Sequence, residues 1–239
     1  MNESLLQISI LHLSVMLLPA IGVIVLLYKW DLNYKETLLA IFRMLLQLLI
    51  IGYFLAYIFE SENPGIILGV LIIMLLASAW IALRTVKTRR RELFLRTLAS
   101  IILGGIFILI LVTQVVLQLD PWFSPRFMIP LAGMIFANAM NSVSLAAERL
   151  TSELEQGKGF DTARGIALRA SLIPITNALF AVGLVSIPGM MTGQILSGIS
   201  PLIAARYQVM VMLMVFASAG ISAGLFLLMV RPLYQEKKL

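Results

Sequence analysis

Seven long apolar runs dominate this sequence, and each is long enough to cross a lipid bilayer as an α-helix. A hydrocarbon core of about 30 Å needs about 20 apolar residues at a rise of about 1.5 Å per residue. Six runs contain no charged residue, and the other is interrupted only by Arg43. The predicted spans are residues 4–28, 37–59, 63–83, 97–119, 127–147, 173–196 and 207–230. The predicted fold class is therefore all-α: a polytopic helix bundle in which residues 1–239 form a single transmembrane domain.

Composition excludes most soluble classes of protein. Hydrophobic residues make up 60% of the chain and charged residues only 13%, which is too few charges to cover the surface of a water-soluble domain of this size. The absence of cysteine excludes disulfides and zinc fingers. The net charge of +6 comes from residues in the connections between apolar runs, so it indicates membrane topology rather than nucleic-acid binding.

The distribution of Lys and Arg predicts how the chain is oriented. Fifteen basic residues lie in the first, third and fifth connections and at the C-terminus, whereas the opposite segments hold only Arg126 and Arg206. Because basic residues concentrate on the cytoplasmic side, we expect the N-terminus outside and the C-terminus in the cytoplasm. The predicted location is the inner (plasma) membrane, which the chain crosses several times.

The longest cytoplasmic connection is expected at about residues 148–171. It is a mixed-charge segment that contains three glycines. Its second half, residues 162–172, fits either a short helix lying across the cytoplasmic face or a plain solvated loop, and the spacing favours neither.

Several kinds of chemistry are missing from the sequence. There is no GxxxxGK[ST] phosphate loop, no HExxH motif and no paired carboxylates, and the acidic residues lie outside the spans or at their ends. The single histidine, His12, fits a packed polar residue better than a ligand. We therefore expect a chain that is not itself an enzyme and binds no cofactor.

Two polar residues in the second predicted span are costly in lipid. Arg43 lies one to two turns from the cytoplasmic end of that span, and Gln47 shares its helical face four residues further on. An arginine at a span centre costs roughly 2.5–3.5 kcal/mol on insertion scales. The pair either reaches the lipid phosphates by snorkelling or faces a pathway inside the bundle.

The fifth predicted span carries Asn138 and Asn141 on one helical stripe with Leu145 and Glu148. Two asparagines at membrane depth must find hydrogen-bonding partners. They either bond to neighbouring helices, at about 0.6 kcal/mol each on average, or form the polar wall of a translocation path. The second interpretation is favoured because another polar cluster follows.

That second cluster is the segment SIPGMMTGQ at residues 186–194. Pro188 removes a backbone donor and breaks a helix, while Gly189 and Gly193 allow close helix approach. A break inside a span leaves carbonyls that must be buried or line a wet cavity. Pro188, Gly189 and Gly193 are thus a predicted hinge, and the predicted substrate contacts are Met190, Met191, Thr192 and Gln194. The alternative is a kinked, tightly packed helix.

The segments IPLAGMIFANAMNSVSLAAERL at residues 129–150 and GLVSIPGMMTGQILSGISPLIAARYQ at residues 183–208 resemble the FetB-type iron-export ABC transporter permeases. Plant relatives of that family pair with a separate ATPase in aluminium tolerance. Arg43, Gln47 and Gly52 also match the family's second span. The residues that the resemblance assigns to the path and hinge are Arg43, Gln47, Asn138, Asn141, Ser142, Pro188, Gly189, Met190, Met191, Thr192, Gly193 and Gln194.

The resemblance implies a homodimer of this chain with two copies of a cytoplasmic ABC ATPase, which would bind ATP and Mg²⁺. It also implies that residues 148–171 dock on the ATPase and transmit its motion. The acidic residue of the family's docking motif is shifted in this chain. The implied coupling residues are Glu148, Arg149, Glu153, Gly157, Asp161 and Arg164.

The function implied is the membrane subunit of an ABC exporter that moves iron or another metal ion outward. No metal ligands are identified, because the spans offer neither carboxylate nor cysteine. A soft or weakly held ion, or an organic or chelated substrate, suits these side chains better. One alternative is ABC export of an organic substrate such as a nucleotide sugar. A second is a membrane scaffold that transports nothing.

Overall fold

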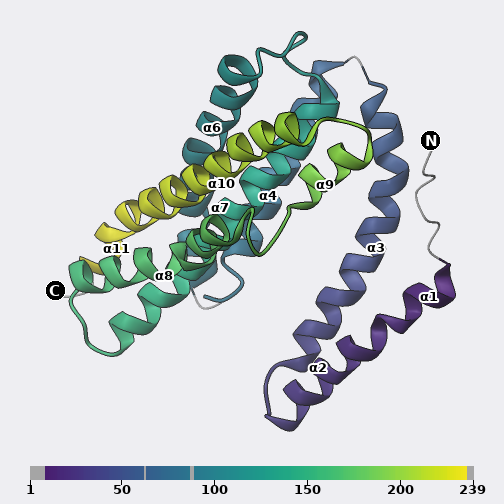
Figure 1. Ribbon diagram of the computed structural model, residues 1–239. Coiled ribbons are helices and arrows are strands. Elements are labelled where there is room, and N and C mark those ends of the chain that lie inside the picture. Colours follow the sequence, from purple (N-terminus) through teal and green to yellow (C-terminus); the bar gives the residue numbers. More distant parts are fainter. Residues whose placement is uncertain (1–8, 62, 87–88, 236–239) are drawn as a thin grey trace. The chain divides into compact units, whose positions relative to one another are not determined.

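The structure is a computed structural model, and it describes residues 9–61, 63–86 and 89–235. These residues form helices joined by short connections, with one isolated bridge between Val182 and Ser186 (Figure 1). The first helices are α1 (Ile10–Val15), α2 (Leu17–Lys29), α3 (Tyr34–Phe59) and α4 (Pro64–Ala82). A continuous stretch follows, made of α5 (Arg90–Ile101), η2 (Ile102–Ile106), α6 (Phe107–Ile110) and η3 (Leu111–Val116). The remaining helices are α7 (Pro125–Glu155), α8 (Phe160–Ala181), α9 (Gly189–Leu196), α10 (Pro201–Met229) and α11 (Arg231–Gln235).

The chain divides into two compact units, Met1–Glu60 and Ser61–Leu239. In the first unit α2 contacts α3 across a turn in which Asp31 has a φ of 56°. Neither α1 nor α2 buries a residue. Most of the large apolar side chains of this unit are exposed, as expected for helices that face lipid. The predicted organisation as a single transmembrane domain stays a prediction.

Three long helices of the second unit begin in the same way. A proline at the first helical position follows Asn63, Ser124 or Ser200, at the starts of α4, α7 and α10. Proline suits this position because its missing N–H would have no helical partner there and its φ is already helical. At α4, Asn63 Oδ1 also accepts a hydrogen bond of 2.8 Å from the N–H of Gly65.

The core of the second unit is built around α7. This helix contacts α4, α8 and α10, and α10 also packs on α5 and η2. Ile135, Phe136 and Ala139 of α7 and Phe226 of α10 are at most 1% exposed. The arrangement gives α7 protein neighbours along much of its length, so its polar residues lie in or beside the bundle.

Two glycines allow this packing. A Cβ atom on Gly104 of η2 would lie 2.4 Å from Ser222 Oγ of α10, and a Cβ on Gly105 would lie 3.0 Å from the Phe136 ring. Contacts below 3.0 Å do not occur between real side chains without movement. Only glycine therefore lets η2 approach α10 and α7 so closely.

The predicted class, an all-helical membrane protein, is confirmed. Within the described residues six helical segments are long and apolar enough to span a bilayer, one fewer than the seven predicted runs. They are Ile10–Lys29, Tyr34–Phe59, Pro64–Ala82, Arg90–Val116, Pro125–Glu155 and Pro201–Met229. The predicted orientation stays a prediction. The first residues of the first run and three of the basic residues behind the orientation, Lys87, Lys237 and Lys238, lie outside the described residues.

The predicted span at residues 173–196 is not one helix. Its first part is the end of α8, which stops at Ala181, and its last part is α9, which begins at Gly189. Gly183 has a φ of +82° in the connection, and Pro188 is the N-cap of α9 with extended backbone angles. A left-handed residue and a proline both end helices, so the chain restarts here rather than kinking.

The predicted connection at residues 148–171 is also not a loop. Glu148 to Glu155 continue α7, residues 156–159 make a short turn, and α8 begins at Phe160. The short helix considered for residues 162–172 is the first half of α8, which has 22 residues. Charged residues hid this helix from the hydropathy pattern, because Asp161, Arg164 and Arg169 all fall in its first three turns.

The close approach of η2 and α10 generates a stability prediction. We expect Gly104→Ala to destabilise the protein by about 1–3 kcal/mol, because the added methyl overpacks against Ser222. Gly69→Ala in α4 is the matched control, since nothing lies within 4 Å of its Cβ position. That change should be neutral or slightly stabilising. Thermal unfolding of both variants in the same detergent measures the difference, and equal melting temperatures would contradict the predicted contact.

Candidate functional site

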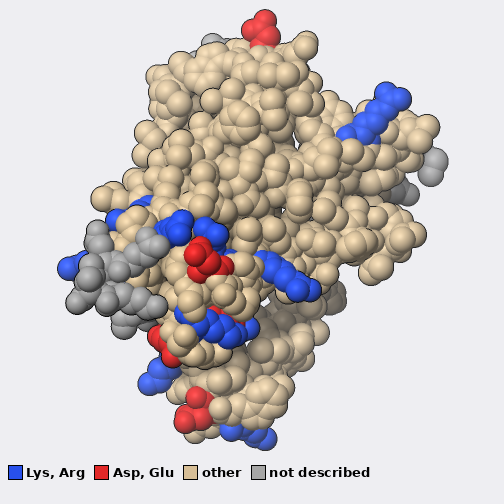
Figure 2. Space-filling view, turned by 90° about the vertical axis from the view of Figure 1, so that its left-hand side faces the viewer, with Lys and Arg blue, Asp and Glu red and all other residues tan. Residues whose placement is uncertain are grey.

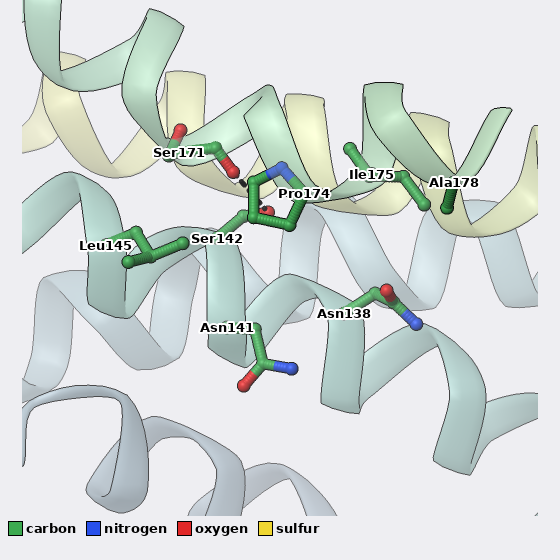
Figure 3. A pocket seen from close by; sticks show the side chains of 8 residues that line it. All are labelled: Asn138, Asn141, Ser142, Leu145, Ser171, Pro174, Ile175 and Ala178. Atoms are coloured by element: carbon green, nitrogen blue, oxygen red, sulfur yellow. Dashed lines mark hydrogen bonds between the residues drawn. The ribbon is translucent and has the colours of Figure 1, made fainter. Parts of the chain in front are cut away.

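A cavity of about 130 Å³ lies between α7 and α8. It is lined by side chains in two facing rows, one on each helix (Figure 3). We call it the α7–α8 pocket; its lining residues are Asn138, Asn141, Ser142, Leu145, Ser171, Pro174, Ile175 and Ala178. The three polar residues predicted on the fifth span are thus brought together in one cavity.

Hydrogen bonds hold the polar rim of the pocket in place. Ser142 Oγ donates across the helix interface to the carbonyl oxygen of Ser171 at 3.3 Å. Ser171 Oγ donates to the Leu168 carbonyl at 2.8 Å, and Asn138 Nδ2 donates to the Met134 carbonyl at 2.8 Å. In the described part of the chain the Asn141 side chain makes no hydrogen bond, and it is exposed at the mouth of the pocket.

The pocket lies deep along α7. Asn138 is thirteen residues from the start of the helix at Pro125, or about 20 Å at a rise of about 1.5 Å per residue. No charged residue occurs in α7 between Arg126 and Glu148. Polar side chains at such depth are costly unless they are paired or face water, and Asn138, Ser142 and Ser171 are paired by the hydrogen bonds above. The role of the polar α7 residues in a translocation path stays a prediction.

The structure does not bring the other predicted path residues into this pocket. Met190, Met191, Thr192 and Gln194 lie on α9, which contacts α10. Thr192 Oγ1 donates to the Pro188 carbonyl at 3.2 Å, and Gln194 Oε1 is buried with no partner among the described residues. Their role in a path stays a prediction.

Arg43 and Gln47 lie on α3, in the first unit. Both are exposed, and Gln47 lines a shallow apolar depression with Leu48, Ile50 and Ile51 of the same helix. Their assignment to the path likewise stays a prediction.

The predicted hinge residues stand at the start of α9. Pro188 caps this helix, Gly189 is its first residue and Gly193 lies in its second turn. They mark the end of the connection from α8 rather than a kink within a span. Their role as a hinge stays a prediction.

Sequence reasoning missed the α8 wall of the pocket. Ser171 and Pro174 lie three residues apart on one face, and Pro174 leaves the carbonyl four residues earlier without its helical donor. A proline three residues after a serine inside a helical pattern was the available signal, but the predicted loop boundary at residue 171 concealed it.

A second feature is the turn that joins α7 to α8. We call residues 153–161 the α7–α8 corner. The N–H of Gly157 donates to the Leu154 carbonyl at 3.0 Å and the N–H of Lys158 to the Glu153 carbonyl at 3.2 Å. Gly157 has a φ of +81°. These bonds form a Schellman motif, which ends a helix by satisfying its last carbonyls.

A buried carboxylate lies beneath this turn. Glu153 is 0% exposed, and its two oxygens pair with Arg149 Nη2 at 2.6 Å and with Lys158 Nζ. Lys158 therefore contacts Glu153 through both its backbone N–H and its side chain. Because a buried carboxylate without counter-charges would be costly, the two cations and Glu153 hold the corner as one unit.

The corner is linked to the start of α5 and to α11. Asp161 pairs with Arg164 at 3.2 Å and with Arg231 of α11 at 3.7 Å. The Phe160 and Tyr234 rings lie 6.0 Å apart, and the Arg89 guanidinium lies 4.1 Å from the Tyr234 ring centroid. Several basic segments thus meet at one end of the second unit, and Figure 2 shows Lys and Arg interspersed with acidic side chains.

Of the six predicted coupling residues, the structure groups five around this corner. The buried ion cluster contains Arg149 and Glu153, and the turn contains Gly157. The adjoining ion pair is formed by Asp161 and Arg164. Glu148 is exposed on the last turns of α7. Sequence reasoning missed Phe160 and Tyr234 because their contact joins segments far apart in the sequence. It missed Lys158 because the turn that brings it to Glu153 was predicted as part of a loop.

The described residues include no group of three or more His, Asp or Glu side chains placed to hold a metal ion. The α7–α8 pocket offers only amide, hydroxyl and carbonyl groups. Such neutral oxygens are ligands of hard cations, which they hold weakly without carboxylates.

Comparison with known proteins gives a consistent set of relatives. A profile of the uncharacterised protein family UPF0014 matches residues 8–234. A UPF0014 membrane protein of Synechocystis is 38% identical over 229 residues, 86% of each chain. The probable iron export permease protein FetB of Escherichia coli is 34% identical over 203 residues, 79% of this chain and 77% of the relative. Protein ALUMINUM SENSITIVE 3 of Arabidopsis thaliana is 32% identical over 236 residues, 90% of this chain and 85% of the relative. No solved structure matches significantly. The resemblance drawn from the sequence is confirmed.

The Schellman turn generates a prediction with a control inside the same corner. We expect Gly157→Ala to cost about 1–2 kcal/mol, because an L side chain is strained at its left-handed φ. Gly159→Ala should be nearly neutral, since Gly159 has a φ of −64° and open space around it. Thermal unfolding in detergent measures both variants. A Gly159→Ala loss equal to that of Gly157→Ala would show that the left-handed turn does not form.

Proposed function

We propose, from the premise that the chain belongs to the UPF0014 family of membrane proteins, that it is the membrane-spanning subunit of an ATP-driven exporter. The cargo of this exporter is iron or another metal ion, which moves out of the cytoplasm. The relative named a probable iron export permease supports this cargo, since it aligns with most of the chain.

The observation that carries the proposal is the pairing of a polar pocket and an ordered corner on the same two helices. α7 and α8 line the pocket at membrane depth, and the turn that joins them presents exposed residues at 155–159. Because both helices run without interruption from the corner to the pocket, a displacement of the corner is transmitted to the pocket wall.

The energy source in this proposal is a partner. The sequence contains no phosphate loop, so ATP and Mg²⁺ bind to a separate cytoplasmic ABC ATPase that docks on the α7–α8 corner. Two copies of this chain and two ATPase subunits complete the transporter in the inner membrane. The corner then lies on the cytoplasmic side, as the distribution of basic residues predicts.

Reconstitution tests the proposal directly. The chain and a candidate ABC ATPase from the same genome are co-expressed, purified and placed in vesicles, and iron movement is followed with and without ATP. ATP-dependent movement of iron supports the proposal. Export of a nucleotide sugar and not of iron would show that the proposed cargo is wrong. A stable complex without ATP-dependent transport would favour a membrane scaffold.

Docking at the corner generates a prediction about assembly. Asp161→Arg places a third positive charge between Arg164 and Arg231, which disrupts the corner through like-charge repulsion. We expect the amount of ATPase that co-purifies to fall by about tenfold, equivalent to about 1.4 kcal/mol of binding free energy.

Asp120→Arg is the control for this change. Asp120 is exposed in the connection before α7, at the opposite end of that helix from the corner. Its variant should retain the ATPase at the unaltered level. Equal retention of the ATPase by both variants would contradict docking at the corner.

A further inference from the structure

The hydrogen bonds around the α7–α8 pocket leave it rich in acceptors. The hydroxyl protons of Ser142 and Ser171 are both donated to backbone carbonyls, so these side chains turn only oxygen lone pairs toward a ligand. Asn138 has committed one of its two amide protons to the Met134 carbonyl and keeps its Oδ1 free. The remaining donors of the polar side chains belong to the amides of Asn138 and Asn141.

The pocket carries no formal charge. Its eight lining residues include no Asp, Glu, Lys, Arg or His, and the other four side chains are apolar walls. An anionic ligand would therefore meet only the remaining amide N–H groups of Asn138 and Asn141, with no cation to balance its charge. A cation would meet favourable dipoles, but no carboxylate that could replace its bound water.

The volume of the pocket sets a limit on the ligand. A cavity of about 130 Å³ is well below the roughly 300–1,000 Å³ of pockets that enclose drug-sized molecules. Since one water takes up about 30 Å³, the space corresponds to about four waters. It admits part of the water shell of a small ion, whose other waters remain at the exposed mouth beside Asn141, and it is too small to enclose a nucleotide sugar.

We propose that the α7–α8 pocket binds a hydrated metal cation through the cation's own water molecules. The waters donate hydrogen bonds to the oxygens of Asn138, Asn141, Ser142 and Ser171, and the metal keeps its inner shell. Neutral oxygens do not offset the free energy needed to strip the bound waters from the cation, whereas hydrogen bonds mediated by those waters cost little. This inference rests on the proposed export function, because it names the state in which the cargo occupies the pocket.

Water-mediated binding explains why a metal-exporting chain needs no cluster of acidic or sulfur ligands in this pocket. A cation held through its waters binds weakly and leaves readily, which suits a site that must release its cargo on each cycle. A pocket of this kind distinguishes ions by their size and charge rather than by their preference for soft ligands.

The test uses an ion that cannot lose its inner shell. Hexaamminecobalt(III) presents inert N–H donors in the same arrangement as a hexahydrated cation. The purified chain in lipid nanodiscs is titrated with Mn²⁺, whose binding is followed by electron paramagnetic resonance, and hexaamminecobalt(III) is then added. We expect hexaamminecobalt(III) to displace the Mn²⁺.

The variants locate the effect in the pocket. Asn141→Leu should weaken binding of both ions by about tenfold or more, and because Asn141 is exposed the change should leave folding intact. Asn177→Leu is the matched control, since Asn177 is exposed on α8 but does not line the pocket. Ser171→Ala, which removes one acceptor oxygen, provides a second variant.

The outcomes separate this inference from the export function. Mn²⁺ that resists displacement by hexaamminecobalt(III), or equal losses in Asn141→Leu and Asn177→Leu, would overturn water-mediated binding in this pocket. ATP-driven Mn²⁺ export by the reconstituted complex would still stand in that case. Conversely, displacement and the loss confined to the pocket variants support the inference even if no ATPase associates with the chain, a result that would overturn only the proposed function.

Discussion

Lipid offers no hydrogen bonds, and the structure of this chain follows from that constraint. Backbone groups at membrane depth must bond within their own segment, so the spans are helices. The same constraint acts on side chains: Thr113 donates to the Leu109 carbonyl at 2.8 Å and Asn138 to the Met134 carbonyl. Each bonds to its own helix one turn back. Polar residues can therefore occur deep in the bundle without a partner on another element.

Against this background the α7–α8 interface is unusual, because a hydroxyl crosses it. Ser142 donates to the Ser171 carbonyl of α8, three residues before Pro174. At 3.3 Å this is a long hydrogen bond, and it adds to the packing of α7 on α8. At the corner, by contrast, Glu153 is enclosed by two cations and a Schellman turn. A helix pair that transmits motion needs a corner held together by strong contacts, such as this ion cluster, and fewer polar bonds along the rest of its interface.

The sequence predicted the helical class and the polar stripe on α7, because apolar runs and a helical spacing are local properties. Asn138, Asn141 and Leu145 share the pocket as that spacing indicated, and Ser142, which the family resemblance supplied, lies there too. The predicted span at residues 173–196 failed for an equally physical reason. Hydropathy registers apolar length, but Gly183 at a positive φ and the proline cap at residue 188 divide the run. The contact of Arg89 with Tyr234 lay beyond prediction, since residues so far apart in the chain are brought together only by the packing of whole helices.

The length of α7 has a consequence for the membrane itself. Its 31 residues extend about 46 Å, whereas the hydrocarbon core is about 30 Å thick. If the core begins at Pro125, the helix leaves it near Leu145, just before Glu148 and Arg149. The remaining three turns form an overhang that carries the buried ion cluster clear of the acyl chains. A bilayer of a different thickness would shorten or lengthen this overhang, so lipid composition sets how far the corner reaches into the aqueous phase.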